Sequence, residues 1–228
     1  MGWVVAFAGQ KGGTGKTTVA TAFAVAAAED GATVAIGDFD VRQRSSAHWG
    51  ERRAANGLKP QVRVEVMANE KAVRLARELV DLLVLDLPGT ADGLTLSVAK
   101  ESDLVVVVTD TNALELEPTV DLLRALERDG VKAPRVVVAL TKVLDEKRAE
   151  EAKVYLEKAG FEPLPVYLPH SRYVHDIGND GRAAVEVPNA GAARQVRAFV
   201  QGLVDAFGRA TAQFRERSSN EAKKGRDR

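Results

Sequence analysis

The chain has 228 residues, of which 45% are hydrophobic and 28% charged, and its 32 basic and 32 acidic residues give a formal net charge of zero. This composition is typical of a globular protein with one large domain or two small ones. The absence of cysteine excludes disulfides, thiolate zinc sites, cysteine-ligated iron–sulfur clusters and cysteine nucleophiles. No apolar run approaches the roughly 20 residues that span a bilayer. We therefore expect a cytoplasmic protein.

Short apolar segments alternate with helical patterns along the whole chain. The apolar segments predict strands, and the stretches between them predict helices. Strands are expected at 3–8, 33–38, 62–67, 82–86, 104–109, 135–141 and 164–167, and helices at 16–29, 46–55, 70–80, 94–99, 114–128, 146–158 and 192–214.

This alternation predicts an α/β fold with a single doubly wound, mainly parallel sheet and helices on both faces. Most expected strands are continuously apolar, as strands covered on both faces are. Ser45 and Asn69 are candidate N-caps, and Gly130 and Gly160 are candidate helix stops.

The C-terminal end differs in composition from the rest. From Arg209 onward the chain has seven basic and three acidic residues, and residues 215–228 are almost all charged or polar. We expect residues 1–214 to form the domain and residues 215–228 to form a polar, basic, frayed or disordered tail.

The first expected strand leads into a glycine-rich segment with the sequence GQKGGTGKTT, followed by an apolar helix. Glycines allow such a loop to curl so that its N–H groups point at phosphate oxygens, and the helix N-terminus adds a favourable dipole. Lys16 would neutralise the β- and γ-phosphates, and the Thr17 hydroxyl would ligate Mg²⁺. A nucleotide with β- and γ-phosphates and Mg²⁺ are the expected ligands. The expected phosphate-binding residues are Gly12, Gly13, Thr14, Gly15, Lys16, Thr17 and Thr18.

This segment departs from the general phosphate-loop pattern, because Gln10 stands where a glycine is usual and Lys11 adds a second lysine. With these residues, the sequence KGGTGKT resembles the deviant Walker A box of the ParA/MinD family of ATPases. The resemblance implies that Lys11 reaches across an ATP-dependent homodimer to the partner's nucleotide, so that Lys11 and Lys16 are both catalytic residues.

Two acidic strand ends extend the resemblance. The segment DFD at 38–40 matches the start of the family's Asp-x-Asp-Pro-Gln, with Val-Arg-Gln in place of Pro-Gln. The resemblance implies that Asp40 positions or activates the attacking water and helps to hold Mg²⁺. The segment LLVLDLPG at 82–89 resembles the family's Walker B strand. It implies that Asp86 binds Mg²⁺, directly or through water, and that the Gly89 N–H meets the γ-phosphate. An acid at the carboxyl end of a buried strand also faces the ligand crevice of such a sheet.

Further positions are assigned through the resemblance alone. Thr141 and Lys142 end the sixth expected strand, where relatives contact the base, and Pro188 is expected to close the same pocket. DNA-binding relatives hold phosphates with surface arginines and do not read sequence. The corresponding candidates here are Arg172, Arg194 and Arg197.

Taken over most of the chain, the resemblance is closest to small ParA proteins of the ParF type. It implies a slow, partner-stimulated ATPase that binds nonspecific DNA as a nucleoid-associated ATP dimer and drives partition of plasmid or chromosomal DNA. A ParB-like centromere-binding protein would be the adaptor. The polar end at 215–228 argues against a membrane helix. The alternatives are the same ATPase positioning a chemoreceptor cluster, a carboxysome or a conjugation complex, a metabolic ligase of the dethiobiotin synthetase kind, and a non-catalytic nucleotide-gated scaffold.

Overall fold

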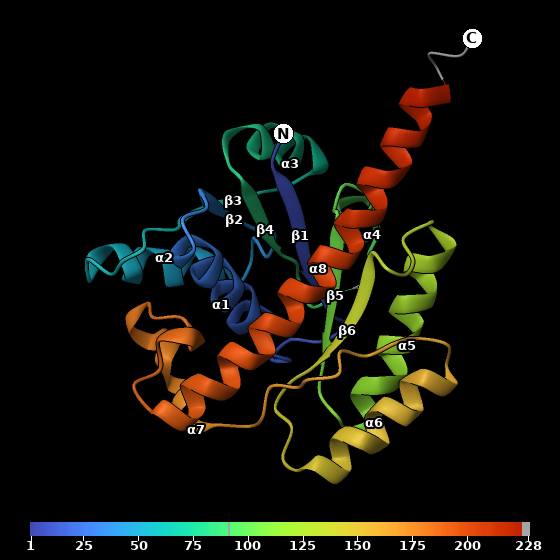
Figure 1. The fold of residues 1–228 in the computed structure, drawn as a ribbon. Coiled ribbons are helices and arrows are strands. Elements are labelled where there is room, and N and C mark those ends of the chain that lie inside the picture. The colour runs from blue at the N-terminus through green and yellow to red at the C-terminus, as the bar shows by residue number, and fades with distance from the viewer. Residues whose placement is uncertain (91, 225–228) are drawn as a thin grey trace.

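A six-stranded sheet forms the centre of the molecule (Figure 1). The computed structural model describes residues 1–90 and 92–224, with side chains up to residue 212. All paired strands are parallel, in the order β3-β2-β4-β1-β5-β6. The expected doubly wound parallel sheet is therefore confirmed. The strands are β1 (Trp3–Ala8), β2 (Val34–Asp38), β3 (Arg63–Val66), β4 (Leu82–Asp86), β5 (Leu104–Thr109) and β6 (Val136–Leu140).

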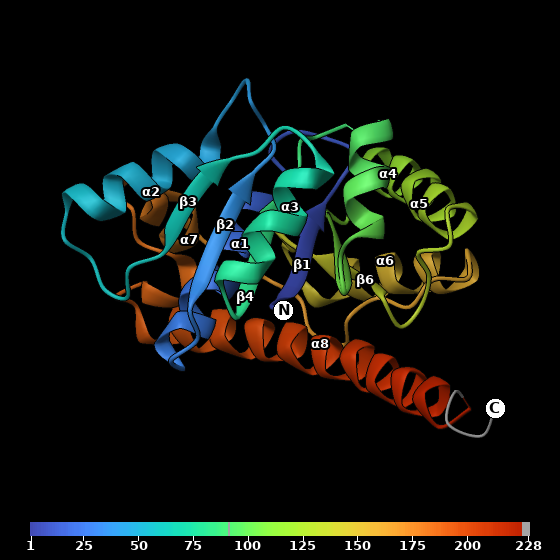
Figure 2. The same cartoon turned by 90° about the horizontal axis from the view of Figure 1, so that it is seen from above.

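Helices cover both faces of this sheet, and α8 crosses one face obliquely (Figures 1 and 2). One apolar cluster joins the sheet to α1 and α8, and a second joins it to α3, α4, α5 and α6. Among the described residues, no helix combines the length and apolar character needed to cross a membrane. The helices are α1 (Lys16–Glu29), α2 (Ser45–Ala55), α3 (Glu70–Ala76), α4 (Gly93–Lys100), α5 (Ala113–Arg128), α6 (Glu146–Lys158), α7 (Arg172–Asp176) and α8 (Ala190–Lys224), with short 3₁₀ helices η1 (Arg77–Leu79), η2 (Ile177–Asp180) and η3 (Ala184–Glu186).

The central strands are apolar throughout because each of their faces packs on helices. In β1, Val5 and Phe7 belong to the cluster with α1 and α8, whereas Val4 and Ala6 belong to the cluster with the opposite helices. This two-sided burial explains why the strand positions could be recognised from continuous apolar runs.

The prediction of a strand at 164–167 is wrong, because the structure has no regular strand there. The chain at 163–169 runs along β6 and makes isolated bridges at its two ends, Pro163 with Val138 and Pro169 with Val143. Leu164 and Leu168 donate N–H bonds to the carbonyls of β6 at 2.8 and 2.9 Å. Proline has no N–H to donate, so the prolines in this segment interrupt a regular ladder.

Several expected helix boundaries are confirmed. Asn69 caps α3, since its side chain accepts a hydrogen bond from the Ala72 N–H. Gly130 and Gly160 follow α5 and α6 with φ of 83° and 93°, the left-handed conformation that ends helices and favours glycine.

The prediction that Ser45 is the N-cap of α2 is wrong. Arg44 occupies the cap position, and Ser45 is the first helical residue of α2. The Arg44 N–H donates to the Asp40 carbonyl at 2.7 Å and closes a turn before the helix. The Asp38 carboxylate accepts the Ala47 N–H at 3.0 Å and thereby satisfies a free amide of the first turn. An acid from the preceding strand thus replaces the local serine cap.

Two helices differ in extent from the sequence prediction. The helix expected at 70–80 divides into α3 and η1. The final helix begins at Ala190 and continues to Lys224, past its expected end and into the segment expected to be a frayed tail. Residues 225–228 of that segment lie outside the described residues, and the division into a domain and a tail stays a prediction.

Candidate functional site

A cavity of about 870 Å³ opens at the carboxyl ends of the strands. β1 lies between β4 and β5, so the loop after β1 emerges where the winding of the sheet reverses, the usual ligand position in such folds. The lining includes most of the expected phosphate loop and both expected acidic strand ends. These lining residues are Gly12, Gly13, Gly15, Lys16, Thr17, Thr18, Asp40, Asp86 and Gly89.

The phosphate loop has free amide groups and a buried lysine. Gly13 and Gly15 have φ of 81° and 93°, which only glycine adopts without strain. In the described part of the chain, the N–H groups of Gly13, Gly15 and Lys16 have no hydrogen-bond acceptor. The Lys16 ammonium donates to the Lys11 carbonyl at 2.8 Å, and burial lowers the pKa of Lys16. This arrangement of amides and a cation suits an anion such as a phosphate.

Thr141 and Lys142, at the end of β6, hold the same loop from the side. The Thr141 hydroxyl donates to the Thr14 carbonyl at 2.6 Å, and the Lys142 ammonium donates to the Gly13 carbonyl. Both residues line the cavity, and their contact with a nucleotide stays a prediction. Their side chains fix the carbonyls of the loop, a role that the sequence pattern does not reveal.

Asp86 is the focus of a buried hydroxyl cluster. Its Oδ2 accepts hydrogen bonds from the Thr17 and Ser46 hydroxyls, each at 2.7 Å. Burial raises the pKa of Asp86 to about 6, although both hydroxyl bonds oppose this shift. Ser46 was not among the residues that the sequence pattern predicted for the site. A hydroxyl residue at the start of the helix that follows the acidic end of β2 is the signal that could have indicated it.

Asp40 closes the loop formed by Val41, Arg42 and Gln43. Its Oδ1 accepts the N–H groups of Arg42 and Gln43 at 3.2 and 2.9 Å. This loop brings the Asp40 carboxylate to the cavity wall. The neighbouring Asp38 is fully buried, and burial raises its pKa.

The donor set fits Mg²⁺. Thr17 contributes a hydroxyl, Asp86 and Asp40 contribute carboxylates, and all three face one cavity. Mg²⁺ typically takes one or two carboxylates together with substrate phosphates and water. Within the described residues, no group of three or more His, Cys, Asp and Glu side chains could hold a metal, so a fully protein-built cage is absent there.

Lys11 has a different environment from Lys16. Its ammonium donates to the Leu114 carbonyl at 2.8 Å and to Glu115 Oε1 at 3.2 Å, and its side chain is 43% exposed. The Lys11 side chain therefore extends from the phosphate loop to the start of α5.

Gly89 lies directly against the phosphate loop. A Cβ atom at this position would come within 2.8 Å of the Gly12 nitrogen. Any side chain at Gly89 would therefore displace one of the two loops.

The segment between β6 and α8 also contributes to the cavity lining. Pro188 is exposed, and among the described residues it is not part of the lining, so the structure does not bring it to the pocket. The residues of this segment that line the cavity, none of which a sequence pattern indicated, are Leu168, Pro169, His170, Ser171, Val174 and His175.

The three candidate DNA-contacting arginines differ in their partners. Arg172 on α7 is exposed, and its guanidinium donates to the Tyr173 hydroxyl at 3.1 Å. Arg194 on α8 is also exposed. Arg197 on α8 pairs with Glu29 of α1 at 3.0 Å, so it already has a counter-ion.

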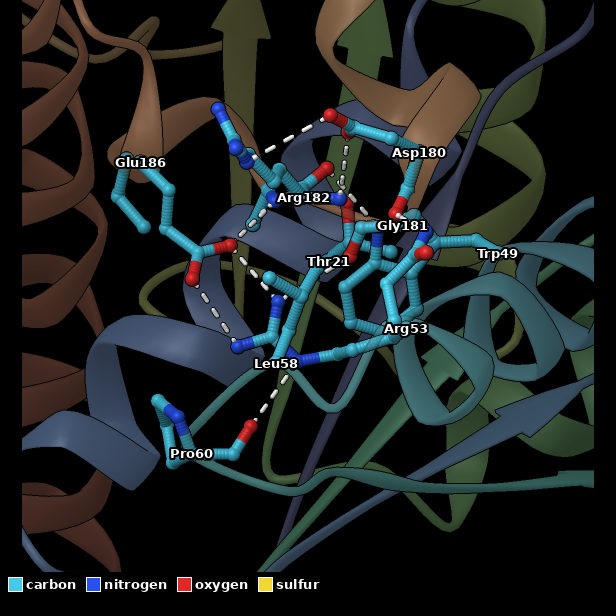
Figure 3. A network of polar contacts seen from close by, with 12 residues as sticks. Thr21, Trp49, Arg53, Leu58, Pro60, Asp180, Gly181, Arg182 and Glu186 are labelled. Atoms are coloured by element: carbon cyan, nitrogen blue, oxygen red, sulfur yellow. Dashed lines mark hydrogen bonds and ion pairs between the residues drawn. The ribbon is translucent and has the colours of Figure 1, made fainter.

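A buried arginine connects α2 to the segment before α8 (Figure 3). Arg53 is 1% exposed and donates to both carboxylate oxygens of Glu186, at 2.7 and 3.1 Å. It also donates to the carbonyls of Pro60 and Gly181 at 2.9 and 3.1 Å, and its guanidinium lies 5.3 Å from the Trp49 ring centre. This cluster fixes α2, and with it Ser46, relative to the cavity.

Three solved structures illustrate the similarity of this fold to known proteins. MinD from Pyrococcus horikoshii, in complex with Mg-ADP, shares 18% identity over 89% of this chain and 96% of that chain, with a TM-score of 0.72. A ParA family ATPase from Chlorobium tepidum shares 16% identity over 88% and 99%, with a TM-score of 0.70. Cyanothece McdA without ligand shares 14% identity over 89% and 100%, with a TM-score of 0.68. At these identities the similarity shows the fold.

The sequence itself carries the family assignment. A comparison with curated protein sequences gives no match. Residues 5–184, which include the phosphate loop and both acidic strand ends, match the CobQ/CobB/MinD/ParA nucleotide binding domain. The chain therefore belongs to the CobQ/CobB/MinD/ParA family of nucleotide-binding proteins, which includes the MinD- and ParA-type ATPases.

Proposed function

We propose that the chain is a Mg²⁺-dependent ATPase that forms a homodimer when it holds ATP and then binds DNA without reading its sequence. Its role would be the partition of plasmid or chromosomal DNA, with hydrolysis slow until a ParB-like adaptor stimulates it. The observation that carries the proposal is the different placement of two lysines of one loop. Lys16 lies against its own phosphate loop, whereas Lys11 extends to α5, where it remains available to a second copy.

Within one protomer, the proposed roles follow from position. Lys16 and the loop amides bind the phosphates. Thr17 and Asp86 hold Mg²⁺, which when bound neutralises charge that develops on the phosphate oxygens. Asp40 orients the attacking water from the cavity wall. Gly89 lies against the phosphate loop, and its N–H contacts the terminal phosphate.

In the proposed dimer, Lys11 leaves Glu115 and contacts the nucleotide of the partner. The ion pair that it leaves is partly exposed, with side-chain exposures of 43% and 23%, so its loss costs little. A phosphate in a closed interface is a stronger partner for the ammonium than a half-exposed carboxylate. ATP would therefore favour the dimer.

DNA binding is proposed for the exposed surface of α7 and the beginning of α8. The short helix η3 packs against α8 and against η2, which directly follows α7, and this packing connects the two elements. Arg172 and Arg194 are exposed on them. Because a dimer presents this surface twice, two weak sites would act together and raise the affinity.

The test is binding of a random-sequence duplex with ATP, with ADP and without nucleotide, at two salt concentrations, with dimerisation followed by light scattering. ATP-dependent binding by the dimer that weakens strongly with salt is expected. Dimerisation without DNA binding would overturn the DNA role and favour the same ATPase acting on another surface. Failure of ATP to produce a dimer would overturn the role of Lys11 and favour a metabolic enzyme.

A further inference from the structure

Ser46 is a fully buried hydroxyl residue that has no role in the family resemblance. It is the second residue of α2, and its Oγ donates to Asp86 Oδ2 at 2.7 Å. The Thr17 hydroxyl donates to the same oxygen at 2.7 Å. Two hydroxyls from different helices therefore fix one oxygen of a carboxylate that lines the cavity.

The position of Ser46 is set by the sheet. Asp38 and Asp86 are paired in register at the ends of β2 and β4. Asp38 accepts the Ala47 N–H at 3.0 Å, so the start of α2 is held directly over these two strand ends. This anchoring directs the Ser46 hydroxyl to Asp86. Ser45 and Asp86 line the cavity, whereas Ser46 is not among the lining residues.

Asp86 has one oxygen that is fixed and one that is available. Oδ2 accepts both hydroxyl bonds, whereas no described residue donates a hydrogen bond to Oδ1. A hydroxyl that ligates a cation through its oxygen still has its proton to donate, so Thr17 can keep its bond to Oδ2 when its oxygen faces the cavity. Ser46 adds a second bond that is independent of the ligand.

We propose that Ser46 is a positioning residue for Mg²⁺–nucleotide binding and acts through Asp86. By holding Oδ2, it directs Oδ1 to the cation or to its bound water. The inference rests on the proposed binding of Mg²⁺ and nucleotide at this site. Residues that orient a metal ligand in this way typically change metal affinity by about 10- to 100-fold when they are removed.

The experiment measures binding of a fluorescent ADP analogue while Mg²⁺ is titrated, and in EDTA. Ser46→Ala is expected to raise the Mg²⁺ concentration for half-maximal tightening by about 10- to 100-fold and to leave the affinity in EDTA unchanged. Ser46→Thr, which keeps the hydroxyl, is expected to restore the wild-type Mg²⁺ dependence.

The control is Ser102→Ala, which removes another buried serine hydroxyl, bonded to the Val98 carbonyl at 3.0 Å and distant from the cavity lining. It is expected to keep the wild-type Mg²⁺ dependence. If Ser46→Ala does not fold, Ser46→Cys replaces it, because a thiol is a weak donor, and the same Mg²⁺ shift is expected.

Each outcome decides one question. Wild-type Mg²⁺ dependence in Ser46→Ala or Ser46→Cys overturns the role of Ser46. An equal loss of affinity with and without Mg²⁺ also overturns it, because it indicates a general effect on the fold. A wild-type protein whose nucleotide affinity does not respond to Mg²⁺ overturns instead the proposed function on which the inference rests.

Discussion

Replacing Glu186 with glutamine is expected to destabilise the folded chain by about 3 kcal/mol. Arg53 is 1% exposed and loses its counter-charge in this variant. Glutamine keeps one acceptor oxygen and presents an N–H group to the guanidinium in place of the other. Removing one partner of a buried ion pair typically costs about 3–5 kcal/mol. The lower value is expected because two carbonyls still accept bonds from Arg53 and Glu186 is 16% exposed.

Urea unfolding of the nucleotide-free protein measures this effect, and a melting temperature about 6–12 °C lower should accompany it. The matched control is Glu51→Gln, which removes a carboxylate paired with Arg44 at 3.9 Å. Both of those side chains are largely exposed, so a change below about 0.5 kcal/mol is expected. The double variant of Arg53→Met with Glu186→Gln should be less destabilised than the sum of its single variants by about 2 kcal/mol. If Glu186→Gln costs no more than Glu51→Gln, the reasoning about the buried arginine is refuted.

Four further predictions concern the site and its surface. Burial raises the pKa of Asp86 to about 6, above its ordinary value. The free energy of unfolding of the nucleotide-free protein should therefore fall as pH rises from about 4 through 6, because Asp86 must ionise while buried. The expected loss is about 3 kcal/mol. Asp86→Asn should remove this loss in urea unfolding between pH 4.5 and 8, and an unchanged slope would contradict the assignment. Lys16→Ala should abolish ATP binding in calorimetry, whereas undiminished turnover would remove the lysine from the phosphate site. Lys11→Ala should keep nucleotide binding and lose the ATP dimer in sedimentation, and a stable dimer would exclude its role toward the partner. Arg172→Glu should weaken DNA retention with no change in nucleotide affinity, and an unaltered salt dependence would show that Arg172 contacts no phosphate.

The parts of the site that could be predicted are those that depend on local sequence. The phosphate loop is a continuous segment between a strand and a helix, and Asp86 ends a continuously apolar strand. Both therefore lie where the pattern places them. The expected strand at 164–167 failed for a local reason as well, since the prolines around it remove the N–H groups that a ladder needs.

The parts that could not be predicted depend on contacts between distant segments. The Ser46–Asp86 bond requires the register of β2 and β4, which a single sequence does not specify. The placement of Lys11 depends on the start of α5, about 100 positions further along the chain. Arg53 looks like a surface residue in a polar helix, and only the return of the chain at Gly181 and Glu186 buries it (Figure 3).

The two edges of the sheet are closed in different ways, and this limits how copies of the chain can aggregate. β3 has only four residues, and its Arg63 and Glu65 form an ion pair at 3.2 Å. Along β6, the segment with Pro163 and Pro169 donates hydrogen bonds to the carbonyls of the edge strand. Short charged edges and proline-covered edges both resist the addition of another strand. Fibre growth by strand pairing is therefore suppressed, and association of these molecules is left to reversible side-chain and ligand contacts.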